Sequence, residues 1–408
     1  MCRTTYYLSI LVSCLWLSFL VLSELEAQTC SVSEQVITVD LKESTIRTPP
    51  TGELIIPVVV HVVWKDIADN ISDEQIFSQI DALNRDFNQL NDQSALSADF
   101  KPLAANINMK FCLARQDPKG NFTSGITRTR TNYDNIWSQM GATLADPIPR
   151  RRIYRNILEG HDSWDPTRYL NIWVGKLGNG KAGYGTFPGV LKAEDSDGIV
   201  VDPNFFGTVG TAANNSNFNQ GRTAVHEIGH YLNLYHPWGQ GASNFDCKAD
   251  DLVEDTPRQE EAVYGCPSAF IFQCGNKVMS MNFMNFVSDN CMSLFTKGQK
   301  IRMVDALMSY RADLLRSNAC QAVDSRDISE EFMCKVYPNP TEDNLYVTFL
   351  SAAKRTYSIS DLTGRILQTG HLDSENNSLN VSTFAAGFYQ LGINIGKQHH
   401  VVRFVKTP

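Results

Sequence analysis

The chain has 408 residues and a formal net charge of −8; 43% of the residues are hydrophobic and 20% are charged. This length exceeds the roughly 250–300 residues at which a single core stops growing, so at least two domains are expected. The hydrophobic content excludes a disordered chain, and an acidic chain without a long Lys/Arg run gives no electrostatic surface for nucleic acid. Ten cysteines suit an exported protein with a few disulfides.

Residues 1–27 have the pattern of a cleavable signal peptide. Arg3 precedes an apolar run from Tyr7 to Leu22, and Ala27 offers a small residue before a cut. The alternative is a membrane anchor, but a span needs about 20 apolar residues and this run is shorter. No later stretch is long and apolar enough to cross a bilayer, so we expect no transmembrane segment after the signal is removed.

The next predicted elements begin an α/β-mixed region. Residues 28–52 are polar and end in a Pro- and Gly-containing turn, which indicates a linker. A β-branched run at 55–64 predicts a buried strand. Ser72 is expected to cap a following helix, with Gln75 completing a capping box. Spacings of three and four give that helix one apolar face, made by Ile76, Ile80, Leu83, Phe87 and Leu90.

Strand and helix signals stay mixed up to about residue 320. Further strands are predicted at 108–114, 169–174 and 199–201, and a Gly-rich irregular stretch at 175–189. After residue 333 the helical period disappears, and short alternating runs are separated by turn residues. Such runs at intervals of roughly 8–12 residues indicate a β-sandwich. Residues 335–408 are therefore expected to form a separate all-β module after a linker at 321–334.

The strongest chemical signal is the segment TAVHEIGHYLNLYH, residues 223–236. Positions i and i+4 share one face of a helix, so His226 and His230 are expected to hold one zinc ion. Glu227 lies beside that face, where it can take a proton from water on the metal. His236 is the third candidate ligand, and it can reach the ion only if the chain turns sharply after the helix.

The turn before the third histidine is expected at Asn233, because asparagine is the non-glycine residue that best adopts positive φ. One alternative is a pair of surface histidines on an amphipathic helix. Another is a purely structural zinc, but such sites usually close with a fourth protein ligand, commonly Cys. No Cys lies between His226 and His236, and Glu227 would have no role in a structural site.

The segment HEIGHYLNLYH resembles the extended zinc motif of the metzincin metallopeptidases. The resemblance implies an α+β catalytic domain with a twisted mixed sheet, an active-site helix and a tight methionine-containing turn below the zinc. Met284, within residues 281–286, fits that turn. Together with the downstream cysteines and acidic run, the chain resembles the pappalysin-like (cytophagalysin) branch. We therefore expect a zinc peptidase domain over residues 53–320.

The pappalysin resemblance also implies a disulfide pattern and a calcium site. Sequence alone allows three pairings of four cysteines, and the family pattern would give Cys247–Cys274 and Cys266–Cys291. The acidic run at 250–257 resembles the family's calcium loop; a solvated acidic loop is the alternative. The implied calcium ligands are the side chains of Asp251 and Thr256 and the backbone carbonyls of Asp250 and Glu254.

Two positions depart from the family pattern. Close relatives place a Tyr two residues after the turn methionine, where this chain has Phe286, so any role of that hydroxyl is lost or moved. Relatives that favour basic residues after the cut have an acid just before the last cysteine of the set. This chain has Asn290 there, beside Asp289, so a strong preference for Arg or Lys does not follow.

The tail resembles the C-terminal sorting domain of type IX secretion substrates from Bacteroidetes. The resemblance rests on VYPNPT at 336–341, LYV at 345–347, ISDLTGR at 359–365, GFY at 387–389 and FVK at 404–406. A generic carbohydrate-binding or adhesive sandwich is the alternative. The resemblance implies that residues 335–408 engage the type IX secretion machinery and that the protein is secreted or displayed on the outer surface of a Bacteroidetes-type bacterium.

These features predict a secreted zinc endopeptidase that hydrolyses proteins or peptides, with Glu227 as general base and then acid. Pappalysins usually keep a pro-segment, so residues 28–52 are expected to be removed, with Arg47 a possible cut point. Cys30 either blocks the zinc as a thiolate or forms a disulfide. The rivals are a cell-surface binding or adhesive protein with weak or no catalysis, and hydrolysis of a small amide. No role follows for Cys112, Cys320 and Cys334.

Overall fold

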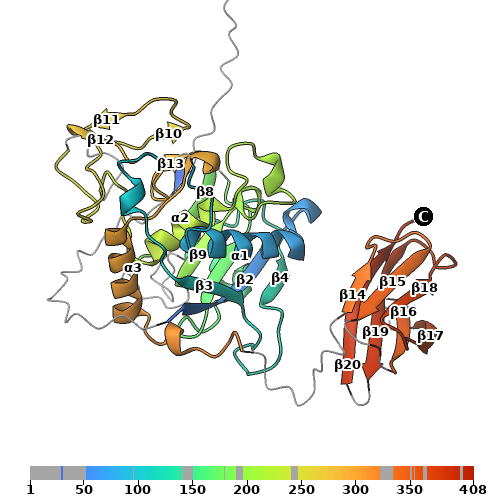
Figure 1. The fold of residues 1–408 in the computed structure, drawn as a ribbon. Coiled ribbons are helices and arrows are strands. Elements are labelled where there is room, and N and C mark those ends of the chain that lie inside the picture. The colour runs from blue at the N-terminus through green and yellow to red at the C-terminus, as the bar shows by residue number, and fades with distance from the viewer. Residues whose placement is uncertain are drawn as a thin grey trace, which may run out of the picture. The chain divides into compact units, whose positions relative to one another are not determined.

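The computed structural model describes residues 29–30 and 52–408, except 95, 138, 141–149, 179, 190–195, 240–246, 322–333, 350, 351, 353, 362–364 and 396–397. The chain divides into two compact units, one ending at Cys320 and the other beginning at Gln321 (Figure 1). The expected signal at 1–27 lies outside the described residues, as do nearly all of 28–52 and of 321–334. Within the described part of the chain, no helix is long and apolar enough to cross a membrane.

The first unit is built on a mixed sheet, as the predicted fold class requires. From edge to edge its strands are β1 (Thr29–Cys30), β8 (Lys181–Gly185), β9 (Gly198–Val201), β7 (Leu170–Val174), β2 (Leu54–Trp64) and β3 (Met109–Leu113), and β4 (Ile126–Arg130) also pairs with β2. Only the β8–β9 pair is antiparallel among these. The strand predicted at 55–64 is the interior strand β2, which pairs with β3, β4 and β7 and is buried on both faces.

The helices cover one face of the sheet. Val58 and Val60 of β2 share a core with α1 (Asp73–Phe87), α2 (Arg222–Tyr231) and α3 (Lys297–Tyr310). Alternate residues of the same strand, such as Val59 and Val63, pack into separate clusters on the other side. This layering places α2 directly against the end of the sheet that contains β8 and β9 (Figure 1).

Helix α1 differs from its prediction in two respects. Ser72 caps it by accepting a hydrogen bond from the Gln75 backbone N–H at 3.2 Å. The Gln75 side chain does not complete the box, because its Oε1 accepts the Thr211 N–H at 3.0 Å and its amide donates to the carbonyls of Pro203 and Phe206 at 3.0 and 2.8 Å. Those buried partners outcompete the local bond. The helix ends at Phe87, so Leu90 is 74% exposed and does not join the apolar face.

Several short strands carry the loops around the sheet, and some were not predicted. β8 lies inside the stretch at 175–189 that was expected to be irregular, and β4 gave no clear strand signal. The remaining short elements of this unit include β5 (Gln139–Met140), β6 (Arg150–Arg151), β10 (Tyr264–Gly265), β11 (Phe272–Gln273), β12 (Asn276–Lys277), β13 (Phe286–Val287) and the 3-10 turns η6 (Pro203–Phe205), η8 (Asp289–Cys291) and η9 (Leu314–Arg316).

The second unit is a β-sandwich, as predicted. One sheet has the order β14-β15-β18 and the other β17-β16-β19-β20. The strands are β14 (Cys334–Tyr337), β15 (Asn344–Phe349), β16 (Thr356–Asp361), β17 (Ile366–His371), β18 (Asn376–Asn380), β19 (Gly387–Ile395) and β20 (Gln398–Lys406). Both sheets contribute to one core, for example through Val347, Ile359 and Leu391. The polar strand β18 was missed, because only Leu379 in it is buried.

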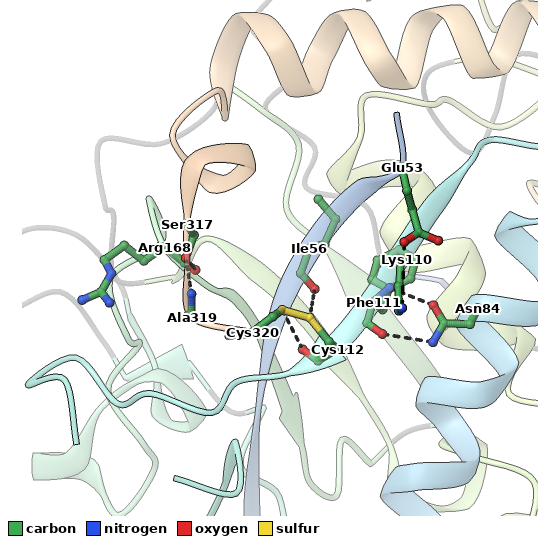
Figure 2. The surroundings of a disulfide bond; sticks show 10 residues. All are labelled: Glu53, Ile56, Asn84, Lys110, Phe111, Cys112, Arg168, Ser317, Ala319 and Cys320. Atoms are coloured by element: carbon green, nitrogen blue, oxygen red, sulfur yellow. Dashed lines mark hydrogen bonds and ion pairs between the residues drawn. A yellow bond between two sulfur atoms is a disulfide. The ribbon is translucent and has the colours of Figure 1, made fainter. Parts of the chain in front are cut away.

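Three disulfides join described residues of the first unit. The pairs Cys247–Cys274 and Cys266–Cys291 follow the crosswise pattern that the resemblance implies. The third bond joins Cys112 on β3 to Cys320, 208 residues later (Figure 2). Ala319 is buried beside it, and its carbonyl accepts a hydrogen bond from the Arg115 N–H at 2.7 Å. The last residues of this unit are therefore fastened to the sheet, whereas Cys334 is in no disulfide.

Candidate metal centre and active site

Helix α2 is held unusually close to strand β8. His226, Glu227 and His230 on the helix are completely buried. Gly183 and Gly185 face them from the strand, two residues apart and therefore on one side of it. A Cβ added to Gly183 would lie 2.7 Å from Oε1 of Glu227, and one added to Gly185 would collide with the Glu227 backbone carbonyl. Glycine at 185 therefore permits the close approach of the helix backbone, and glycine at 183 leaves room for the Glu227 side chain.

The chain reverses sharply after α2. The helix ends at Tyr231, and Asn233 has φ = 71°. The Leu234 N–H then donates to the carbonyl of Gly229 at 2.9 Å, which closes the turn against the helix. The prediction of a left-handed residue at Asn233 is confirmed. The reversal returns His236 to the helix face that carries the other two histidines.

The three histidines bring one nitrogen each to a common point. The Nε2 atoms of His226, His230 and His236 are 3.1–3.2 Å apart in every pair. In a tetrahedral zinc site with Zn–N distances of about 2.0–2.1 Å, two ligand nitrogens lie about 3.3 Å apart. The triangle therefore has the size that a zinc ion requires. Among the described residues, no other group of three or more His, Cys, Asp or Glu side chains has metal-binding geometry.

The protonation of this triangle also suits a cation. The Nδ1 atoms of His226 and His230 lie 2.8 Å from the carbonyls of Phe283 and Leu234, and a carbonyl can only accept a hydrogen bond. Both rings therefore carry their proton on Nδ1 and direct a bare Nε2 lone pair at the common point. Burial lowers the pKa of His226 to about 4 and that of His230 and His236 well below 6.5, which favours the neutral rings that bind metal.

Met284 lies directly against helix α2. It is fully buried, and a Cβ added to Gly229 would collide with its sulfur. The preceding Phe283 carbonyl orients His226, as described above. The next residue, Asn285, is also fully buried; its amide donates to Gln259 at 3.0 Å and accepts from the Val263 N–H at 3.0 Å. Sequence reasoning identified Met284 but missed Asn285, whose partners are more than 20 residues away.

Phe286 takes a structural place beside the histidines. Its ring lies edge-on to His236 and Trp238, at centroid distances of 4.9 and 5.0 Å, and 5.6 Å from His226. Trp238 in turn stacks on His236 at 4.5 Å. Tyr264 on β10 is 5.8 Å from the Phe286 ring. The position at which close relatives carry a tyrosine therefore supplies an aromatic ring that packs against His226 and His236.

The acidic loop is less convergent than the histidine site. Asp251 is buried, and its carboxylate accepts hydrogen bonds from the Thr256 hydroxyl at 2.7–2.8 Å. Asp250 forms an ion pair with Arg258 at 2.9 Å, and Glu254 is exposed. The structure thus brings the side chains of Asp251 and Thr256 together. The carboxylates of Asp250 and Glu254 do not join them; the backbone carbonyls of these two residues were the expected ligands.

Two further predicted positions lie at the edges of the site. Strand β1 pairs in parallel with β8, and its register places Cys30 opposite Gly183, the glycine that abuts Glu227. Asn290 is exposed, whereas its neighbour Asp289 is 1% exposed and turned into the protein. The Asp289 carboxylate, two residues before Cys291, is therefore not exposed to solvent.

Comparisons with known proteins agree with this geometry. A family model described as pregnancy-associated plasma protein-A matches residues 155–308, and a model described as a secretion system C-terminal sorting domain matches residues 335–407. Mature mirolysin of Tannerella forsythia, solved with a cleaved peptide, is 40% identical over 67% of this chain and 98% of that chain, with a TM-score of 0.59. A promirolysin mutant from the same organism is 39% identical over 66% and 86%, with a TM-score of 0.59. An extracellular metalloprotease of Arthroderma benhamiae is 29% identical over 64% of this chain and 80% of its own.

Proposed function

The chain belongs to the pregnancy-associated plasma protein-A, or pappalysin, family of metallopeptidases and ends in a type IX secretion sorting domain, and on this premise we propose how its residues hydrolyse a peptide bond. The protein is a secreted zinc-dependent endopeptidase, and the relatives do not favour an adhesive role. The observation that carries the residue assignment is the triangle of Nε2 atoms, 3.1–3.2 Å on each side, next to the buried Glu227.

We assign the metal to the Nε2 atoms of His226, His230 and His236. A bound zinc ion would supply a Lewis acid that polarises the scissile carbonyl and makes water acidic near neutral pH. Glu227 follows His226 on the same helix, so its carboxylate is the base within reach of that water. It takes the proton of the attacking water and then gives it to the leaving amine. Its burial excludes bulk water from this proton transfer.

The substrate backbone is proposed to bind along β8. When β1 is absent, β8 is the outer strand of the sheet, and an edge strand binds an extended chain through its main-chain groups. The pairing of β1 with β8 supports this assignment, because a segment of the same chain already uses that edge. The same pairing supports residues 28–52 as a pro-segment that covers the site until it is removed.

The remaining assignments concern the rest of the chain. We propose a signal peptide at 1–27, a peptidase domain at 53–320 and a sorting module at 335–408 that is recognised by the type IX secretion machinery. Calcium binding at 250–256 is proposed as structural, supported by the buried Asp251–Thr256 pair. Calcium requires several oxygens at one point, so it would need the backbone carbonyls of Asp250 and Glu254 in addition.

Casein and short-peptide cleavage by protein lacking residues 1–52 tests the proposal. Wild type is compared with Glu227→Ala and with chelator-treated protein, and zinc content is measured for each. Activity should need zinc and Glu227, while Glu227→Ala keeps one zinc per chain. A wild type that holds stoichiometric zinc but cleaves nothing contradicts the peptidase assignment. Cleavage of short peptides alone indicates a small-amide hydrolase instead.

A further inference from the structure

Helix α2 begins without a cap from its own sequence. The residue before it is Gly221, which has φ = 74° and no side chain, and the first turn contains no acidic residue. The first N–H groups of a helix need acceptors, and a carboxylate there is favoured by the helix dipole. The helix that carries two histidines and Glu227 therefore depends on another part of the chain at its N-terminus.

We propose that Asp289 is a positioning residue. It caps α2 from outside the helix and keeps the segment 283–289 in register with His226 and Glu227. Its Oδ2 accepts hydrogen bonds from the backbone N–H groups of Gln220 at 2.7 Å and Arg222 at 3.3 Å. The inference rests on the proposed peptidase function and adds a residue to it.

A buried chain of alternating charges fixes Asp289. The Arg222 guanidinium donates to the Asp289 backbone carbonyl and, through Nε, to Asp86 at 3.2 Å. Asp86 also accepts two hydrogen bonds from Arg85. Nε donates to Oδ1 and Nη2 donates to Oδ2, each at 2.9 Å. Arg85 further donates to the carbonyl of Gln220 at 2.9 Å. The network joins α1, α2 and, through the main chain of Asp289, η8; removal of a charged member, Arg85, Asp86 or Arg222, leaves a buried charge without its partner.

Asp289 stands at one end of a segment that touches α2 at three places. At the other end, the Phe283 carbonyl orients the His226 ring. Next to it, Met284 packs under Gly229. Two residues after Asp289, the disulfide at Cys291 anchors the segment to Cys266. A shift of the segment at Asp289 is therefore transmitted to the ring that would bind metal.

Burying the Asp289 carboxylate costs more free energy than an exposed cap of the same helix would. Its side chain is 1% exposed, its Oδ1 has no hydrogen-bond partner, and burial raises the pKa of Asp289 to about 6. A Ser, Thr or Asp at the residue before the helix is the ordinary cap and needs no buried remote carboxylate. A remote carboxylate ties two elements together, which a local cap does not do.

Asp289→Asn tests the proposal, because it keeps the shape and one acceptor oxygen but removes the charge. Zinc affinity is measured by chelator competition, together with kcat and KM on a short peptide. Asp202→Asn is the matched control: Asp202 is a buried aspartate that caps η6 by accepting the Asn204 N–H at 3.1 Å. We expect Asp289→Asn to weaken zinc binding about 10–100-fold and to lower kcat more than it raises KM, with little change in the control.

Wild-type zinc affinity and kcat in folded Asp289→Asn would overturn the proposal. If that variant does not fold, amide hydrogen exchange of the wild type decides. Protection of the Gln220 and Arg222 amides equal to that of the helix interior supports the cap, and free exchange refutes it. Zinc affinity and exchange do not depend on catalysis, so failure of the peptidase assignment is distinguishable from failure of this inference.

Discussion

Replacing Gly183 by alanine should slow the enzyme about 10–100-fold without unfolding it. The new Cβ would lie 2.7, 2.8 and 3.0 Å from Oε1, Cγ and Cδ of Glu227, whereas ordinary contacts begin at 3.4 Å. The carboxylate must therefore move by about 0.7 Å, and a 1 Å misplacement of a reacting group costs about 100-fold in rate. Because the nearest atoms belong to a side chain, the helix itself need not move. We expect kcat to fall about 10–100-fold while zinc binding and the melting temperature stay near wild type.

Two variants calibrate this result. At Gly185 the clash is with the backbone carbonyl of Glu227, so Gly185→Ala should displace the helix and lower stability and zinc affinity as well as kcat. A Cβ at Gly180 meets nothing within 4 Å, so Gly180→Ala should change stability through its φ of +68° and leave kcat unchanged. The assay is steady-state cleavage of a quenched fluorescent peptide at saturating zinc. Wild-type kcat in zinc-loaded Gly183→Ala would refute the reasoning.

Three other outcomes follow from the structure. Replacing Cys112 and Cys320 by serine opens a loop of 208 residues and should lower the free energy of unfolding in urea by roughly 5 kcal/mol; a loss below 1 kcal/mol would contradict the clamp. Asn233→Val should cost about 1–2 kcal/mol and weaken zinc binding, whereas Asn233→Gly should not; equal behaviour of the two would show that the φ of 71° is unimportant. Burial lowers the pKa of His61 to about 3. Below pH 6.5 the unfolded chain therefore binds a proton that the folded protein does not bind. The free energy of unfolding then decreases by about 1.4 kcal/mol for each unit by which the pH decreases between these two values. In His61→Gln the free energy of unfolding in urea should decrease between pH 7 and pH 4.5 by roughly 2–3 kcal/mol less than in wild type. An unchanged pH dependence would show that His61 has the same pKa in the folded and unfolded protein.

The convergence of the three histidines was predictable because its information is local. His226 and His230 are one helical turn apart, and the reversal needed only one residue able to adopt positive φ, Asn233. The sorting module was predictable for a related reason, since its strands alternate along short continuous runs. Patterns of this kind survive in a single sequence because neighbours in space are also neighbours in the chain.

The features that escaped prediction depend on distant partners. Gln75 binds carbonyls about 130 residues away instead of closing its capping box. Asp289 caps a helix that begins 67 residues before it, and nothing in its neighbourhood indicates that role. Strand β8 was not predicted, because the glycines that let it approach Glu227 are uncommon in strands and indicated an irregular stretch.

X-ray absorption at the zinc edge of the wild-type protein tests the central claim most directly. The account predicts one zinc per chain with three imidazole nitrogens at about 2.0–2.1 Å and no sulfur ligand once residues 1–52 have been removed. Loss of one nitrogen in His236→Ala would identify the third ligand. A spectrum with sulfur ligation in that truncated protein, or one unchanged in His236→Ala, would contradict the assignment of His226, His230 and His236 as the metal centre.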